Sequence, residues 1–261
     1  MQKRHLDRKM YFEELADTSR EFYVDYLSKY KLIQPGLRVL EIGCGEGGNL
    51  LPFVELGCEV VGIDIAENRI EQAKTYFKDV NQIATFICCN FITMQADVLG
   101  KFDIVLVHDV IEHIHKEEKL EFVQNIKRYL ADDGLIFFAF PAWQMPFGGH
   151  QQICEGFASK LPFIHVLPNM LYRGILKLSG ESKEKIDELL DIKECRMQIE
   201  HFESIVKYLD FKITNKIHWF INPHYKRKFG LKPRKVYKLL SKIYYFRNFY
   251  ITSTFYLLEN R

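Results

Sequence analysis

The sequence predicts an α/β protein. Its core is a doubly wound, mostly parallel sheet of seven strands, preceded by N-terminal helices and interrupted by one inserted helical lid. Short apolar runs alternate with helical patterns between residues 38 and 140, the rhythm of parallel strands joined by helices. The first apolar run ends in a glycine-rich turn, and the alternation stops after Pro141 and resumes near residue 200.

Each element follows from the local spacing of apolar residues. Residues 11–30 place aromatic and leucine side chains at mostly helical spacing, so we expect one or two amphipathic helices there. The expected strands are residues 38–42, 59–64, 84–88, 102–108, 135–140, 212–220 and 250–258. The expected helices of the core are residues 48–56, 67–77, 116–130 and 200–209.

The segment 142–198 is too long for an ordinary connection between a strand and a helix. It contains Trp143, Phe147 and three prolines, and an acidic and basic helix is expected near residues 182–194. We interpret it as a lid that contributes to substrate binding within a single domain of residues 1–261.

A second unusual segment, residues 221–248, carries nine Lys or Arg and no acid. The remainder of the chain then has 27 basic and 34 acidic residues, or −7. Its apolar residues recur at i, i+3, i+4 and i+7, which predicts an amphipathic helix over residues 233–245. The cationic side is either a solvated helix face or a binding surface. As a binding surface it would contact an anionic substrate, possible examples being lipid-linked or glycan-linked molecules, or the surface of a membrane.

Bulk composition excludes several classes. A net charge of +2 and the absence of a nucleic-acid motif argue against nucleic-acid binding.

The six cysteines show no CxxC spacing, so we expect free thiols in a reducing compartment. No window approaches the ~20 apolar residues of a membrane span, and the N-terminus has no signal-peptide pattern, so we expect a cytoplasmic protein. The oligomeric state is left open.

The turn after the first strand holds Gly43, Gly45, Gly47 and Gly48, which fits both GxGxG and the dinucleotide pattern GxGxxG. Glycines let the backbone approach a ligand at the start of the next helix. Glu41 precedes the first glycine by two residues, where it would favour a cationic ligand over a pyrophosphate. An acid at the end of the second strand, Asp64, is placed to bind ribose hydroxyls of either cofactor.

Three segments, VLEIGCGEGGN, VVGID and FDIVLVHDVIEHI, together resemble the class I S-adenosylmethionine (SAM) dependent methyltransferases over roughly residues 31–141. The resemblance implies a sheet that ends in an antiparallel strand pair. It also implies methyl transfer from SAM, by in-line displacement, to an unidentified small-molecule or glycan-type acceptor, with S-adenosylhomocysteine as product. The alternatives are an NAD(P)-dependent oxidoreductase and a SAM-binding protein without catalysis.

The resemblance also implies which residues bind the cofactor. Asp64 would bind the ribose, Ile65 would lie along the adenine, and Asn90 would accept from the adenine amino group. His108 would meet the methionine portion. The full cofactor set is Glu41, Gly43, Cys44, Gly45, Asp64, Ile65, Asn90, Phe91 and His108.

Histidine is the commonest proton-transfer residue near neutral pH, so His113 and His150 are the candidate catalytic bases. The alternative for each is a structural role. Residues 108–115 contain three His and two carboxylates that could ligate a cation. Because cofactor contacts and a helix N-terminus already account for a polar cluster there, we predict no metal.

Overall fold

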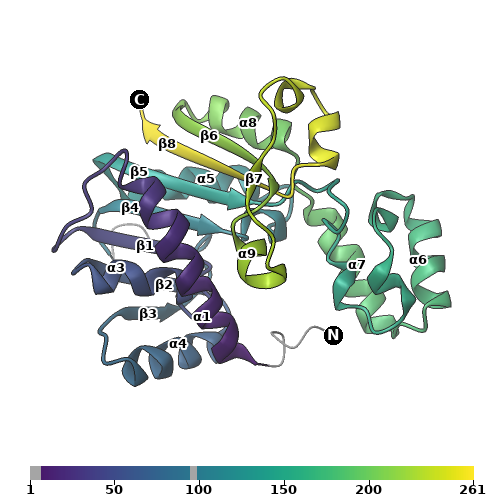
Figure 1. Ribbon diagram of the computed structural model, residues 1–261, viewed down its shortest axis with the longest axis horizontal. Helices are drawn as coiled ribbons and strands as arrows, with labels where there is room; N and C mark the ends of the chain where they lie inside the picture. The colour runs from purple at the N-terminus through teal and green to yellow at the C-terminus, as the bar shows by residue number, and fades with distance from the viewer. Residues whose placement is uncertain (1–6, 95–98) are drawn as a thin grey trace.

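The computed structural model describes residues 7–94 and 99–261, whose core is one eight-stranded sheet with helices on both faces (Figure 1). The sheet order is β3-β2-β1-β4-β5-β8-β6-β7. The strands are β1 (Arg38–Ile42), β2 (Glu59–Asp64), β3 (Thr85–Cys88), β4 (Phe102–His108), β5 (Leu130–Phe140), β6 (Phe211–Ile221), β7 (Arg234–Lys235) and β8 (Ser253–Asn260).

The predicted parallel core is confirmed. Strand β1 pairs in parallel with β2 and β4, β2 with β3, and β4 with β5. Strand β8 runs antiparallel to both β5 and β6, as the resemblance implied. The order reverses at β1 and β4, and in open α/β sheets ligands bind beside the carboxyl ends of the strands at this point.

Helices cover both faces of the sheet, as Figure 1 shows. One hydrophobic cluster packs α1, α3 and α4 against one face, and a second packs α5 and α8 against the other. A six-residue π-helical stretch joins α1 to α2, so the N-terminal region is one continuous helical segment. The helices are α1 (Arg8–Thr18), α2 (Asp25–Leu27), α3 (Leu51–Glu55), α4 (Glu67–Asp79), α5 (Lys119–Ile126), α6 (Asn169–Leu178), α7 (Lys183–Cys195), α8 (Ile199–Tyr208) and α9 (His224–Phe229).

The strand count and the basic segment differ from the sequence prediction. The helix predicted over residues 233–245 is wrong: Arg234 and Lys235 pair with β6 as an eighth strand instead. Leu239, Leu240 and Ile243, which should have formed the buried face, are exposed. An amphipathic pattern produces a packed helix only where a surface is available to cover it.

Several smaller boundaries also differ, among them those of α3, α5, β5 and β8. Helix α5 begins at Lys119 instead of residue 116, after a turn. Strand β5 begins at Leu130, five residues earlier than expected. Its register with β4 shifts between Phe102 and Ile104, and this irregularity accommodates Asp133 and Gly134 within the strand.

The segment 142–198 is helical, as predicted, and stands beside the sheet at the right of Figure 1. It has a small core of its own, which includes Tyr172 and Leu176 of α6 and Leu189 of α7. Helix α7 begins where predicted because the Ser182 side chain accepts a hydrogen bond from the Lys185 amide.

The six cysteines are free. Among the described helices, none combines the length and apolarity needed to cross a bilayer.

Candidate active site

The glycine loop leaves β1 at Ile42 and lies over the carboxyl ends of β1, β2 and β4. Gly43 has φ +73°, and a Cβ at this position would lie 2.3 Å from Cγ2 of Val110. Both the conformation and the close approach therefore require glycine. The loop brings its backbone against the segment that follows β4.

Asp64 anchors this loop. Its two carboxylate oxygens accept hydrogen bonds from the Gly45 and Ala66 amides, both at 2.8 Å. The side chain is nearly buried but still lines a cavity. Asp64 therefore holds the loop in place and presents a carboxylate to whatever fills that cavity.

Glu41 lies beneath the loop instead of lining either cavity described below. Its Oε1 accepts from Asn49 Nδ2 at 2.7 Å, and Oε2 has no hydrogen-bond partner among the described residues. Burial raises the pKa of Glu41 to about 8. Cys44 is also buried, with its Sγ 3.6 Å from the Gly45 carbonyl, and burial raises its pKa.

The first cavity, here called the sheet-end cavity, has a volume of about 430 Å³. It lies at the ends of β1, β2 and β4, where the sheet order reverses. Five of the predicted cofactor residues line it: Gly43, Asp64, Ile65, Asn90 and Phe91. The structure thus brings together residues from three different loops, as the sequence order predicted.

The second cavity, here called the lid cavity, measures 550 Å³ and lies between the sheet and the inserted segment. Predicted residues His108, His113 and His150 line it. Its wall also includes side chains from the N-terminal helix, the insert and the basic segment, among them Tyr11, Tyr23, Phe147, Glu188, Tyr225 and Lys228.

Three residues line both cavities: Arg69, Asp109 and His113. Arg69 has no ion-pair partner among the described residues and lies 4.0 Å from the position of a Cβ on Gly45. Asp109 adopts φ +52°, a strained conformation for a residue other than glycine. The two cavities therefore adjoin beside the glycine loop, at a point lined by a cation, a carboxylate and an imidazole.

The structure brings the two predicted bases together. The rings of His113 and His150 lie 4.7 Å apart, edge to face. Burial, and then the charge of Arg69, lowers the pKa of His113 to about 4. Burial is also the main cause that lowers the pKa of His150 to about 4. The His113 side chain is exposed to the two cavities that it lines. Both histidines are therefore neutral at pH 7.

His108, predicted to lie where the backbone meets the methionine portion of the cofactor, lines the lid cavity and not the sheet-end cavity. Its Nε2 lies 2.7 Å from the Tyr23 hydroxyl, and its Nδ1 lies 3.7 Å from an Asp109 oxygen. His108 therefore connects the N-terminal helical segment to the end of β4, on the lid side of the site.

Glu112 is a residue whose role the sequence did not predict. Its side chain is buried, lines the lid cavity and has no hydrogen-bond partner for either oxygen among the described residues. Burial, and then the charge of Asp109, raise its pKa well above the ordinary value. The nearby Lys119 is wholly buried, donates to the Ile111 and Ile114 carbonyls, and has its pKa lowered by burial to about 8.

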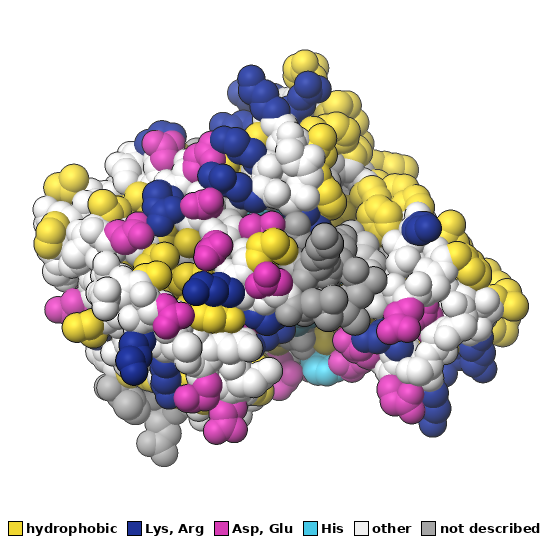
Figure 2. All heavy atoms as spheres, turned by 60° about the horizontal axis from the view of Figure 1, so that its bottom comes forward, with side chains coloured by type: hydrophobic (Ala, Val, Ile, Leu, Met, Phe, Trp, Pro, Cys, Tyr) yellow, Lys and Arg dark blue, Asp and Glu magenta, His cyan; other side chains and the backbone are white. Residues whose placement is uncertain are grey.

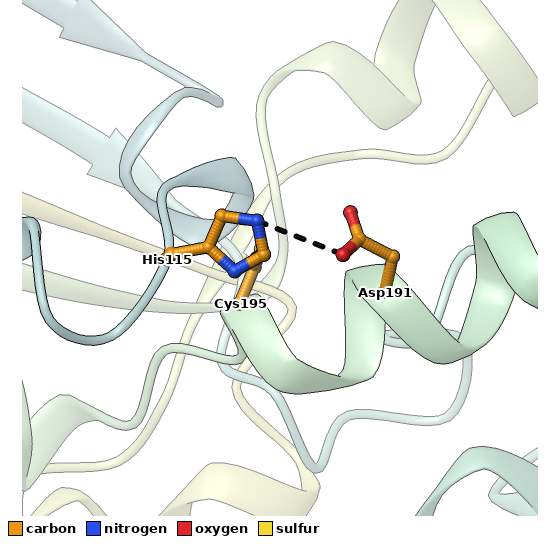
Figure 3. A group of neighbouring side chains, drawn as sticks. All are labelled: His115, Asp191 and Cys195. Carbon is orange, nitrogen blue, oxygen red and sulfur yellow. Dashed lines mark hydrogen bonds and ion pairs between the residues drawn. The ribbon is translucent and has the colours of Figure 1, made fainter.

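The sequence predicts that the polar cluster of residues 108–115 binds no metal. Within the described chain, the one grouping of three possible ligand atoms lies elsewhere, at His115, Asp191 and Cys195, all within 4.8 Å (Figure 3). His115 Nδ1 lies 3.7 Å from Cys195 Sγ, and Nε2 lies 3.6 Å from Asp191 Oδ1. Because these contacts use opposite nitrogens of one ring, they tie α7 to the loop after β4 and do not converge on one point.

The sheet order, the glycine loop and the cavity at the carboxyl ends of the strands are those of a Rossmann-like methyltransferase fold. Residues 40–136 match the family model described as a methyltransferase domain, which confirms the family predicted from the sequence. A ubiquinone biosynthesis O-methyltransferase of Bartonella bacilliformis is 37% identical over 106 residues, 40% of this chain and 41% of the relative. One of Mesorhizobium japonicum is 36% identical over 104 residues, 40% and 41% of the two chains. The chain thus matches about two fifths of the length of these relatives.

Solved structures share the fold over nearly the whole chain. A SAM-dependent methyltransferase of Clostridium acetobutylicum superimposes with a TM-score of 0.59 at 10% identity, over 94% of this chain and 91% of the other. Magnesium protoporphyrin IX methyltransferase of Synechocystis with bound S-adenosylhomocysteine gives a TM-score of 0.56 at 16% identity, over 94% and 84%. At these identities the likeness establishes the fold.

Proposed function

We propose that the protein transfers a methyl group from SAM, bound in the sheet-end cavity, to an oxygen atom of a small molecule bound in the lid cavity. The observation that carries the proposal is the junction of the two cavities at Arg69, Asp109 and His113. In-line displacement requires the attacking atom to approach the methyl carbon opposite the sulfur. Two adjoining cavities provide that arrangement, because each can hold one reactant.

The sheet-end cavity suits the cofactor. Its volume of 430 Å³ lies in the range of ordinary ligand pockets, about 300 to 1,000 Å³. Asp64 would bind the ribose hydroxyls, and Asn90 and Phe91 would contact the adenine. Structures of similar fold hold bound S-adenosylhomocysteine, which supports the same cofactor here. The antiparallel β8 argues against the dinucleotide-dependent alternative.

An oxygen acceptor is supported by the names of the relatives, which are O-methyltransferases. Those names give no support to the glycan-type acceptor suggested by the basic segment. The lid cavity contains carboxylates, imidazoles and tyrosine hydroxyls alongside apolar groups such as Phe147. This mixture suits a small molecule that carries hydroxyl groups on an apolar frame.

A hydroxyl acceptor must lose its proton during the reaction. His113 and His150, with pKa values of about 4, are weak bases and suit the positioning of the acceptor by hydrogen bonds. Glu112 has a raised pKa and unpartnered oxygens, so its carboxylate is the stronger base. We assign proton acceptance to Glu112 and positioning to the two histidines.

The test begins with cofactor choice. S-adenosylhomocysteine at 100 times its Kd should stabilise the chain by about 2.7 kcal/mol, and NADH should not. The protein is then incubated with SAM carrying a deuterated methyl group and a metabolite extract, and labelled products are identified by mass spectrometry. Stabilisation by NADH alone would favour the oxidoreductase. Cofactor binding with no labelled product from any extract would favour a SAM-binding protein without catalysis.

A further inference from the structure

A broad apolar surface lies outside both cavities. In Figure 2, hydrophobic side chains gather along the upper and right-hand edge of the molecule, from the basic segment at the top to the inserted helices at the right. We call this surface the docking face. Its exposed side chains are Phe163, Met170, Leu171 and Leu178 of the insert and Tyr237, Leu239, Tyr244, Tyr245 and Phe246 of the basic segment.

Helix α6 is apolar on two sides. Tyr172 and Leu176 are buried in the core of the insert, whereas Met170 and Leu178 are 82% and 81% exposed. The helix also carries Arg173 and Lys177, so its exposed apolar side chains lie beside charged ones, as in helices that bind at a membrane surface. With ten residues, α6 is too short to span a bilayer, but it can lie along a surface with its apolar side in contact.

Ring contacts connect the two halves of the docking face. Phe163 of the insert lies 6.4 Å from Phe249, and Phe249 lies 5.9 Å from Tyr245. Tyr245 in turn lies 6.0 Å from Phe246. The insert and the basic segment are therefore neighbours, and their exposed apolar side chains form one surface.

The basic segment is positively charged, although Lys226, Arg227 and Arg247 pair with acids elsewhere in the chain. The segment 221–248 has nine basic residues and no acid, whereas the rest of the chain carries a net −7. Lys238 and Lys242, which flank the exposed Leu239 and Leu240, are exposed and have no ion-pair partner in the described part of the chain. The solvated face of the predicted helix does not explain them, because residues 233–245 form only a two-residue strand and the 3-10 turn Leu240–Lys242.

We propose that the docking face binds the surface of an anionic lipid bilayer. Its apolar and aromatic side chains would enter the boundary between headgroups and acyl chains, while the lysines contact the headgroups. Charge complementarity selects an anionic bilayer as the occupant, because the uncompensated cations lie within the same segment as the exposed aromatics. The proposal does not depend on which acceptor is methylated.

Flotation of the full chain with lipid vesicles tests this. Vesicles of phosphatidylcholine alone are compared with vesicles that also contain phosphatidylglycerol, at low and high salt. We expect binding to the anionic vesicles, weakened by salt because surface charges are screened. Absence of binding, or equal binding to both vesicle types, overturns the proposal.

Two variants separate the apolar and cationic contributions. Lys238→Gln with Lys242→Gln should lower partitioning about 25-fold, because each lysine near an anionic surface contributes about fivefold. Met170→Ser with Leu178→Ser should also abolish most binding. The matched control is Ile83→Ser with Lys78→Gln, beside β3 at the opposite edge of the sheet, where both residues are exposed. It should bind as the wild type does.

Thermal unfolding of each variant is measured first, so that a loss of binding in a folded protein can be attributed to the face. Molar mass is measured over a range of concentrations. If the wild type self-associates and Met170→Ser with Leu178→Ser removes that association while leaving vesicle binding unchanged, the face is an interface between copies of the chain and the proposal is overturned.

Discussion

The rings of His113 and His150 meet edge to face at 4.7 Å, joining the loop after β4 to the inserted segment. His150 adopts φ +57°, so the contact is held by a strained backbone. We expect His150→Ala to lower methyl transfer by about tenfold to about a hundredfold through misplacement of the acceptor. Calorimetric affinity for S-adenosylhomocysteine should change less than about twofold.

The pH profile of the same variant separates positioning from base catalysis. Because the pKa of His150 is about 4, activity relative to wild type should drop in parallel between about pH 6 and about pH 8. Loss of a single limb near neutral pH would assign His150 as the base and contradict the positioning role.

Glu112→Gln should reduce kcat by at least about a hundredfold, as expected for loss of a general base. In the wild type, activity should rise with pH as the carboxyl ionises, because only the carboxylate accepts a proton and its pKa is raised. The variant should lose this rise and keep its affinity for S-adenosylhomocysteine. A variant with normal kcat would remove Glu112 from the mechanism.

Asp64→Ala should weaken S-adenosylhomocysteine binding at least about tenfold, because charge-assisted bonds of about 1.5–3 kcal/mol to the ribose are lost. It should also lower Tm, since the Gly45 and Ala66 amides lose their acceptor. Calorimetry and thermal unfolding measure the two effects. Unchanged affinity would show that Asp64 only anchors the loop.

Arg69→Gln addresses the cation at the junction of the cavities, which has no ion-pair partner within residues 7–94 and 99–261. We expect it to bind the carboxylate of the cofactor, so the variant should lose about tenfold to about a hundredfold in affinity for S-adenosylhomocysteine. Affinity for methylthioadenosine, which lacks that carboxylate, serves as the control and should stay constant. An equal loss for both ligands would contradict this assignment.

Glu41→Gln tests the buried carboxyl beneath the loop. The pKa is raised from 4.5 to about 8, so the folded state holds a proton that the unfolded state releases. This contribution to stability is present below about pH 4.5 and is lost as pH rises towards about 8. The stability of the variant relative to wild type should therefore increase over that window, as measured by urea unfolding. A pH-independent difference would mean that Glu41 ionises normally.

The parallel core was predictable because its elements are determined locally. Strands β1, β2 and β4 begin and end where their apolar runs do. The glycine loop and Asp64 were found for the same reason, since a turn and a strand end are visible in a few residues. The basic segment shows the limit of this reasoning: its helical pattern was present, but pairing with the edge of β6 prevailed.

The sequence by itself determined the succession of strands and helices along the chain, the position of the cofactor loop and the residues at the ends of β1, β2 and β3. Tertiary structure alone decided which polar groups face a cavity and which are buried. Glu41 lies beneath the loop, while Arg69 and Glu112 reach the site. Burial and pKa depend on segments far apart in the chain, as at His113 and His150, and no local pattern encodes how closely such segments pack.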